Sequence, residues 1–139
     1  MQTNKPYKYR KFTTIMGPSS SDEEEDLDNP TVCFLTNYPP KECGIATFTK
    51  DLLTTMNQKF DSKFKSRIIA LNEDSNIYNY DKNVVLEINK DDIDDYIDTA
   101  KKINSSNDIK LICVQHEFGI FGGKYGDHLL PFLELIKKP

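Results

Sequence analysis

The stretch "TVCFLTNYPPKECGIATFTKDLLTTMNQKF", residues 31–60, decides the fold class of this chain. It opens with the continuous apolar run 31–36, which is typical of a strand covered on both faces. The two prolines of the following turn, 37–44, exclude a helix there. Apolar side chains then recur at helical spacing, and Thr47 or Thr49 can cap the start of that helix. The apolar positions that predict its buried face are Phe48, Leu52, Leu53, Met56 and Phe60.

The alternation of strand and helix patterns continues along the rest of the chain. Apolar runs at 66–71, 83–88 and 109–115 predict three more strands, and helical patterns cover 91–104 and 127–138. The resulting order, β-α-β-β-α-β-α, predicts an α/β fold, namely a Rossmann-like, doubly wound, mostly parallel sheet with helices on its faces. If the second and third strands build outward from the first, the first and fourth strands are neighbours.

The two later helices carry their own boundary signals. Acidic residues fill the first turns of helix 91–104, and Lys101 and Lys102 lie in its last turn, as the helix dipole favours. We expect Asp127 to cap the last helix and Pro131 to fall in its first turn, where a missing N–H costs nothing. The predicted buried face of helix 91–104 consists of Ile93, Tyr96, Ile97, Ala100 and Ile103.

Composition separates an N-terminal tail from a folded domain. Residues 1–30 end in the acidic run "SSSDEEEDLDNP", which cannot bury enough apolar surface to order itself. We therefore predict a disordered acidic tail over 1–30 and one domain over 31–139. The chain stops directly after a helix, where a doubly wound sheet calls for another strand. We accordingly expect a partial domain whose fourth strand keeps an open edge, available to a partner polypeptide.

Charge and cysteine usage exclude several classes of protein. The 22 acidic residues outnumber the 18 basic ones, and no basic face stands out, which argues against nucleic-acid binding. Three cysteines in separate segments favour reduced thiols over a disulfide framework. No apolar run reaches the eighteen or so residues of a membrane span, and the N-terminus lacks the apolar block of a secretory signal. We therefore expect a cytoplasmic protein without a membrane span.

Two loops follow the carboxyl ends of predicted strands, where α/β sheets bind ligands. In the first loop, Gly44 lies at the start of a helix, whose bare N–H groups can hold a phosphate. The loop is neither a P-loop nor a dinucleotide fingerprint, so a glycine that permits tight strand-to-helix packing explains it equally well. Lys41 and Glu42 either reach a ligand or are simply solvated.

The second loop, "QHEFGIFGG" at 115–123, ends an apolar strand on His116 and Glu117. A lone histidine beside such a strand is more often a core residue than a catalyst, but the adjacent acid and glycines favour a functional role. The three glycines of this loop permit backbone approach and positive φ. Phe118 and Phe121 offer apolar faces on which a ring can stack.

Two other chemistries remain open for the cysteine and histidine residues. A zinc site would combine Cys43, Cys113, His116 and His128, although these cysteines lack the spacing of metal clips. A nucleophile pair would join Cys43, at a helix start that lowers a thiol pKa, to His116 as base. Cys33 and Cys113 otherwise fit a core.

Taken together, "FLTNYPPKECGIATFTKDL" and "VQHEFGIFGGKYGDHLLPFL" resemble the N-terminal domain of GT-B-fold glycosyltransferases of family 4, group 1, in the mannosyltransferase-like branch. The resemblance covers residues 31–139. It implies an acceptor-side domain facing a nucleotide-binding domain across a cleft, and sugar transfer with retention. A nucleotide-sugar is then the co-substrate and a glycan the acceptor, with no cofactor and no essential metal.

The resemblance also implies roles for six residues. His116 matches the strand-end histidine near the transferred group and is the expected catalytic residue. Residues matching the diphosphate-side loop and the acceptor side are expected to bind substrate. The donor domain has no counterpart in this sequence, so we expect little catalysis from the chain alone; the alternative is a non-catalytic glycan- or protein-binding module. The expected substrate-binding residues are Gly44, Ile45, Glu117, Phe118 and Gly119.

Overall fold

The computed structural model describes residues 29–60, 62–73 and 76–139. The predicted tail, 1–30, lies outside these residues apart from Asn29 and Pro30. The observed order of strands and helices is the predicted one, β-α-β-β-α-β-α. In chain order the elements are β1 (Thr31–Thr36), α1 (Gly44–Phe60), β2 (Lys65–Asn72), β3 (Val84–Asn89), α2 (Ile93–Ser105), β4 (Ile109–Val114) and α3 (Leu129–Leu135).

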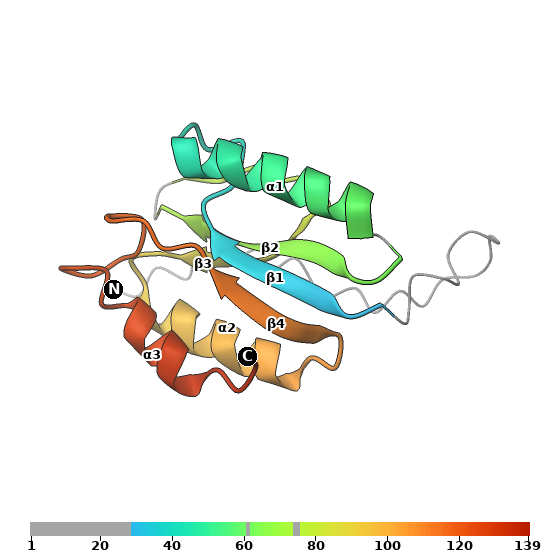
Figure 1. The fold of residues 1–139 in the computed structure, drawn as a ribbon. Coiled ribbons are helices and arrows are strands. Elements are labelled where there is room, and N and C mark those ends of the chain that lie inside the picture. The colour runs from blue at the N-terminus through green and yellow to red at the C-terminus, as the bar shows by residue number, and fades with distance from the viewer. Residues whose placement is uncertain (1–28, 61, 74–75) are drawn as a thin grey trace.

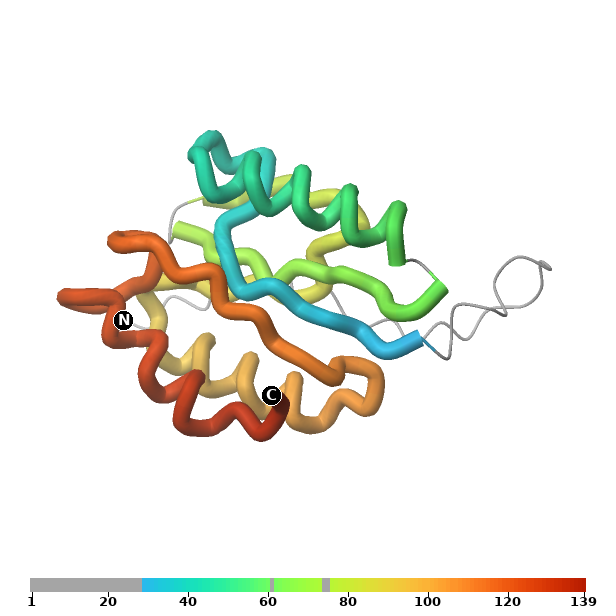
Figure 2. The backbone as a smooth tube through the Cα atoms, viewed as in Figure 1, coloured from blue at the N-terminus to red at the C-terminus, as the bar shows by residue number. Residues whose placement is uncertain are grey.

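The four strands form one parallel sheet in the order β3-β2-β1-β4, so β1 and β4 are neighbours as predicted. The fold is therefore α/β and consistent with a Rossmann-like architecture. Parallel pairing aligns the carboxyl ends of the strands, since Leu35 of β1 lies opposite both Ile69 of β2 and Val114 of β4. Figure 2 shows the chain leaving β1 and β4 at the same edge of the sheet.

Helices cover both faces of the sheet (Figure 1): α1 lies on one face, and α2 and α3 lie on the other. The two buried clusters of the core correspond to these two faces. Leu53 of α1 packs with Phe34 and Ile68, whereas Tyr96 of α2 and Phe132 of α3 pack in the second cluster. Among the described parts of the chain, no helix combines the length and apolar character needed to cross a bilayer.

In each of α1 and α2, one residue of the predicted buried face is exposed, and buried residues were missed: Ala46 and Thr49 in α1, and Thr99 in α2. Phe48 is 59% exposed, because α1 turns the small residues Ala46 and Thr49 toward the sheet, together with Leu53. Neither Thr47 nor Thr49 caps α1, which already begins at Gly44. Ile93 is 43% exposed, because it is the first residue of α2, directly after the capping residue.

The last helix is shorter than predicted and begins differently. Its capping position is His128, not Asp127, and α3 runs only from Leu129 to Leu135. Asp127 instead closes a tight turn, in which its carbonyl accepts from the N–H of Leu130 at 3.0 Å. Pro131 does fall in the first turn.

Strand β4 lies at the edge of the sheet, but the C-terminal residues partly follow it. The backbone N–H of Ile112 donates to the carbonyl oxygen of Pro139 at 2.9 Å. Asn104 of α2 holds the approach to this point, because its side chain bonds the Leu135 carbonyl and the Lys137 N–H, each at 2.8 Å. A partner polypeptide along the β4 edge stays a prediction.

Candidate functional site

The two predicted loops meet at the carboxyl edge of the sheet. The strand β1 leads to the α1 start, and β4 leads to Gln115, whose N–H donates to the Leu35 carbonyl at 3.1 Å. The buried hydroxyl of Thr49 lies 2.5 Å from Gln115 Oε1 and 2.7 Å from the Ile45 carbonyl oxygen. This contact joins the second turn of α1, at Thr49, to the residue that precedes His116. The sheet order therefore brings together two segments about seventy residues apart in sequence.

The start of α1 is open around Gly44. A Cβ added at Gly44 would meet no atom within 4 Å, so this glycine is not needed for tight strand-to-helix packing. Thr47 makes the earliest bond of the helix, from its N–H to the Cys43 carbonyl at 3.2 Å, and no acid lies in the first turn. The preceding N–H groups point out of the helix start, where the dipole favours an anion. Ile45 is half-buried and packs against the core.

The second loop presents three of its predicted site residues to solvent in a row. His116, Glu117 and Phe118 are exposed, and Phe118 is 87% accessible. Phe121 is different, because it is 4% exposed and packs in the core of the α2 face. Its ring stacks on that of His116 with centroids 5.6 Å apart and planes inclined by 23°. The prediction that Phe121 can stack on a ligand is therefore wrong: it supplies the wall behind one face of the imidazole.

Glycines shape the second loop in two ways. Gly119, also exposed, has a φ of 89°, in the left-handed region that only glycine enters freely. Gly122 is buried against other backbone, and a Cβ there would collide with the Lys90 carbonyl and His128. Its N–H donates to the Tyr96 hydroxyl at 3.2 Å. The loop is thus anchored to α2 while its His116 end stays accessible.

The structure does not assemble the alternative cysteine and histidine sites. Cys43 Sγ accepts from the Asn37 amide at 3.6 Å, whereas His116 stacks on Phe121, so neither makes the contact that a nucleophile–base pair requires. His128 lies against Tyr96, with its Nδ1 3.2 Å from the Lys90 carbonyl. Within the described ranges, no three His, Cys, Asp or Glu side chains are placed to hold a metal ion.

The remaining two cysteines behave as core residues. Cys33 is fully buried, and burial raises the pKa of its thiol to about 12, with nearby Arg67 opposing the shift. Cys113 packs beside the α1-face cluster, and burial raises its pKa as well. Both thiols therefore stay protonated and unreactive at neutral pH.

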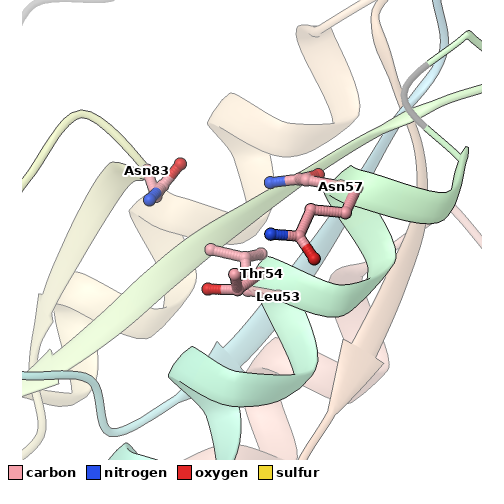
Figure 3. Close-up of a pocket in the computed structure, with 5 residues that line it drawn as sticks. Leu53, Thr54, Asn57 and Asn83 are labelled. Carbon is pink, nitrogen blue, oxygen red and sulfur yellow. The ribbon is translucent and has the colours of Figure 1, made fainter.

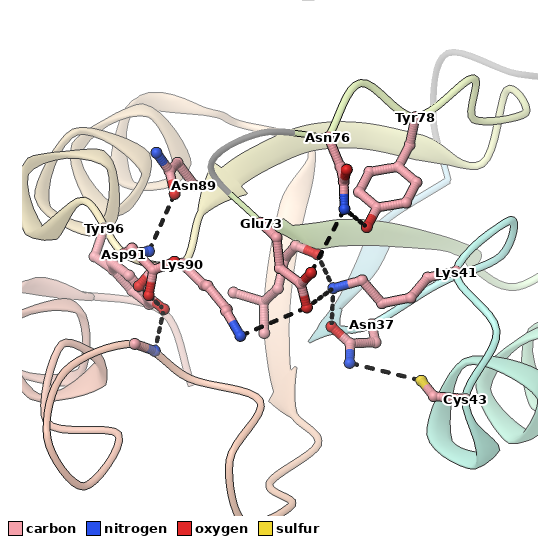
Figure 4. A network of polar contacts seen from close by, with 12 residues as sticks. Asn37, Lys41, Cys43, Glu73, Asn76, Tyr78, Asn89, Lys90, Asp91 and Tyr96 are labelled. Carbon is pink, nitrogen blue, oxygen red and sulfur yellow. Dashed lines mark hydrogen bonds and ion pairs between the residues drawn. The ribbon is translucent and has the colours of Figure 1, made fainter.

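Figure 4 shows a polar network at the same edge that the sequence patterns did not reveal. Lys41 is not simply solvated, because its side chain is only 11% exposed. Its ammonium donates to Asn37 Oδ1 at 3.2 Å and to the Leu71 carbonyl at 3.1 Å. Burial lowers the pKa of Lys41; Glu73 opposes this shift, and Lys90 adds to it. Position in the sequence could have predicted this network, because Glu73 and Lys90 each directly follow a strand, as does the loop that carries Lys41.

The other residues of the first loop are simpler. Glu42 is exposed, as expected for a solvated side chain. A shallow pocket of about 440 Å³ lies elsewhere, between α1 and the start of β3 (Figure 3). Its walls contain only amides, one hydroxyl and one apolar side chain, so it offers hydrogen bonds but no acid, base or nucleophile. The lining residues are Leu53, Thr54, Asn57, Gln58 and Asn83.

Comparison of the chain with family models, with curated proteins and with solved structures finds no significant match. The α/β fold and the convergence of the two loops therefore rest on the geometry alone, and the glycosyltransferase resemblance stays a prediction.

Proposed function

We propose that residues 31–139 form the acceptor-side half of a retaining glycosyltransferase that takes its sugar from a nucleotide-sugar. The observation that carries the proposal is the neighbouring placement of β1 and β4, which brings the open start of α1 and the exposed His116 loop to one edge. A sugar transferase needs an anion-binding element and a polar group at the transfer point close together, and this edge offers both. The possible sugars include mannose, as the resemblance implies.

The proposed roles follow from the exposure of each residue. The N–H groups at Gly44 and Ile45 face the donor diphosphate, whose charge the helix dipole favours. His116 acts at the transfer point as the catalytic residue, with one face of its ring fixed by Phe121. Phe118 offers an exposed aromatic face to the apolar side of a sugar ring. Glu117 and Gly119 shape the acceptor side beside it.

Catalysis in this proposal requires a second domain. Charge develops on the departing nucleotide diphosphate, and stabilising it takes donors arranged on both sides of the cleft. One face alone also leaves the sugar in water, where each electrostatic contact is weaker. We therefore expect binding by the 139-residue chain and transfer only when a donor domain completes the cleft.

Binding by the chain itself is tested by titrating the ¹⁵N-labelled protein with nucleotide-sugars and oligosaccharides. We expect the amide signals of Gly44, Ile45 and Gly119 to shift together, with millimolar affinity. Gly44→Pro removes the N–H that faces the anion, at a helix position that tolerates proline. This variant should weaken nucleotide-sugar binding. An unchanged spectrum in saturating ligand would contradict the placement of the site.

Transfer is tested in a polypeptide that carries both halves. His116→Ala should lower the transfer rate by about 10²-fold or more with the melting temperature unchanged. Lys124→Ala, an exposed change on the same connection, is the matched control and should leave transfer intact. Equal turnover in the two variants would remove the catalytic role from His116.

A second candidate function is a glycan-binding module without catalysis. It is favoured by two aromatic side chains exposed on one connection, Phe118 at 87% and Tyr125 at 75%. Such a module would bind an oligosaccharide with equal affinity in the presence and absence of nucleotide. Dependence of glycan binding on the nucleotide would instead favour the transferase.

A further inference from the structure

Two lysine side chains approach a single carboxylate at the carboxyl edge of the sheet (Figure 4). Glu73 Oε1 lies 3.8 Å from Nζ of Lys41 and 3.6 Å from Nζ of Lys90. The three residues come from three connections, which follow β1, β2 and β3. The network therefore lies where parallel sheets bind ligands, on the opposite side of β1 from the His116 loop.

Lys41 is held in a fixed position. Two of its three ammonium donors are occupied by Asn37 Oδ1 and the Leu71 carbonyl, both within 3.2 Å. Its Nζ also lies 5.6 Å from the centre of the Tyr78 ring. The third donor has no acceptor at hydrogen-bond distance among the described residues, because the carboxylate of Glu73 is too far away.

The backbone of Lys90 is anchored by buried neighbours, whereas its side chain is available to a charged partner. Its carbonyl accepts from the Tyr96 hydroxyl at 3.1 Å and lies 3.2 Å from Nδ1 of His128, so the residue is firmly anchored. Its side chain is 21% exposed, and among the described residues Glu73 is its ion-pair partner.

Glu73 is the loosely held member of this cluster. Its side chain is 47% exposed, and both ammonium groups lie beyond hydrogen-bond distance from its Oε1. Its other oxygen accepts a long bond of 3.5 Å from the Asn76 amide. Within this cluster of three side chains, one carboxylate faces two partly buried ammonium groups that repel each other, so the positive charges outnumber the negative charge there. Asp91 is the other acid that acts on Lys41, and it lies at the exposed end of the same connection as Lys90.

We propose that Lys41 and Lys90 form a binding site for the phosphate group of a small ligand, and that Glu73 occupies this site until phosphate displaces it. A phosphate dianion matches the two cations in charge, whereas the single carboxylate does not. The phosphate group is also small enough for its oxygens to lie at hydrogen-bond distance from both ammonium groups at once. The proposed site therefore prefers a phosphate dianion to a monocarboxylate. The proposal rests on this cluster alone and not on the proposed transferase function.

The test is a titration of the ¹⁵N-labelled 139-residue protein with inorganic phosphate at pH 7.5 and constant ionic strength. Acetate serves as the monoanion control. We expect phosphate, and not acetate, to shift the amide signals of Lys41, Glu73 and Lys90. Methyl phosphate and a nucleoside diphosphate are titrated in parallel. If methyl phosphate binds more tightly than inorganic phosphate, the ligand is a phosphate ester. If the nucleoside diphosphate binds more tightly than both, the ligand is a nucleotide. If neither binds more tightly than inorganic phosphate, the ligand is free phosphate.

Four variants separate the proposed site from general charge effects. Lys90→Met keeps the anchoring backbone carbonyl and should weaken phosphate binding about fivefold, whereas Lys124→Met, an exposed lysine elsewhere, should not change it. Glu73→Gln should strengthen binding by a similar factor, whereas Glu134→Gln on α3 should not. Circular dichroism verifies that each variant is folded.

Three results would overturn the proposal. If acetate shifts the same signals as phosphate, or if Lys90→Met and Lys124→Met bind equally well, the lysines only clamp the three connections together. If Glu73→Gln binds no more tightly than Glu134→Gln, Glu73 does not occupy the site. The comparison of Glu73→Gln with Glu134→Gln removes no cation, so it remains valid even if Lys90→Met is unstable.

Discussion

Tyr96 joins α2 to the loop that carries His116, and its hydroxyl gives the sharpest stability test of the structure. The side chain is fully buried. Its hydroxyl donates to the Lys90 carbonyl at 3.1 Å and accepts from the Gly122 N–H at 3.2 Å. Tyr96→Phe keeps the ring and therefore the apolar burial, but it leaves the buried N–H of Gly122 without this acceptor. The Lys90 carbonyl keeps its contact with His128.

The expected cost is about 1–3 kcal/mol, the penalty for leaving one buried polar group unsatisfied, with no cavity added. With a typical urea dependence, this lowers the midpoint of urea unfolding by about 1 M at an unchanged slope. Burial raises the pKa of Tyr96 to about 12, so the hydroxyl is neutral and the loss should be equal at pH 6 and pH 8. Hydrogen exchange at the Gly122 amide should accelerate in the same variant.

The matched control is Tyr125→Phe, because Tyr125 is 75% exposed and its change removes a hydroxyl from solvent. We expect its unfolding midpoint to equal that of the unmodified protein. A loss below about 0.5 kcal/mol for Tyr96→Phe, indistinguishable from this control, would show that this hydroxyl does not anchor the loop.

Three further predictions follow from single positions. Gly122→Ala should destabilise the domain by several kcal/mol, because the added methyl collides with the Lys90 carbonyl, whereas Gly44→Ala, in open space, should change the melting temperature little. Asp92→Ala should cost about 0.5–2 kcal/mol in urea unfolding, because the side chain caps α2. Burial raises the pKa of Cys33 from 9.0 to about 12, so this thiol stabilises the fold fully below pH 9 and progressively less from pH 9 to 12. The slope of stability against pH in this window should flatten in Cys33→Ala; an unchanged slope would show that Cys33 does not cause it.

The elements of the fold could be predicted because their signals are local. The apolar run 68–71 is typical of a strand that is covered on both faces, and these four residues of β2, an interior strand, are fully buried. Residue spacing likewise placed Tyr96, Ala100 and Ile103 on the buried face of α2. The β1–β4 neighbourhood was predicted on the condition that the second and third strands build outward from the first, and the observed order satisfies this condition.

The errors fall where periodicity alone cannot choose between positions. Phe48 has the right spacing for a buried face, but α1 approaches the sheet through the smaller Ala46 and Thr49. Asp127 has the right chemistry for a cap, but it is used in the preceding turn, so α3 begins after His128. Phe121 lies only two residues after the exposed stretch 116–119, and yet it fills the core together with Ile120.

The α/β class and the two loops that carry Gly44 and His116 could be predicted from the sequence alone, and the strand order around β1 could be predicted under one condition on how the sheet is built. These depend on interactions between residues that are close along the chain or on general rules of strand connection. Which side chains share an environment depends on how the elements pack in three dimensions. Lys41, Glu73 and Lys90 are separated by long stretches of chain, and they meet only because three parallel strands end at one edge. No local pattern records such a meeting, because it is produced by the packing of the whole sheet.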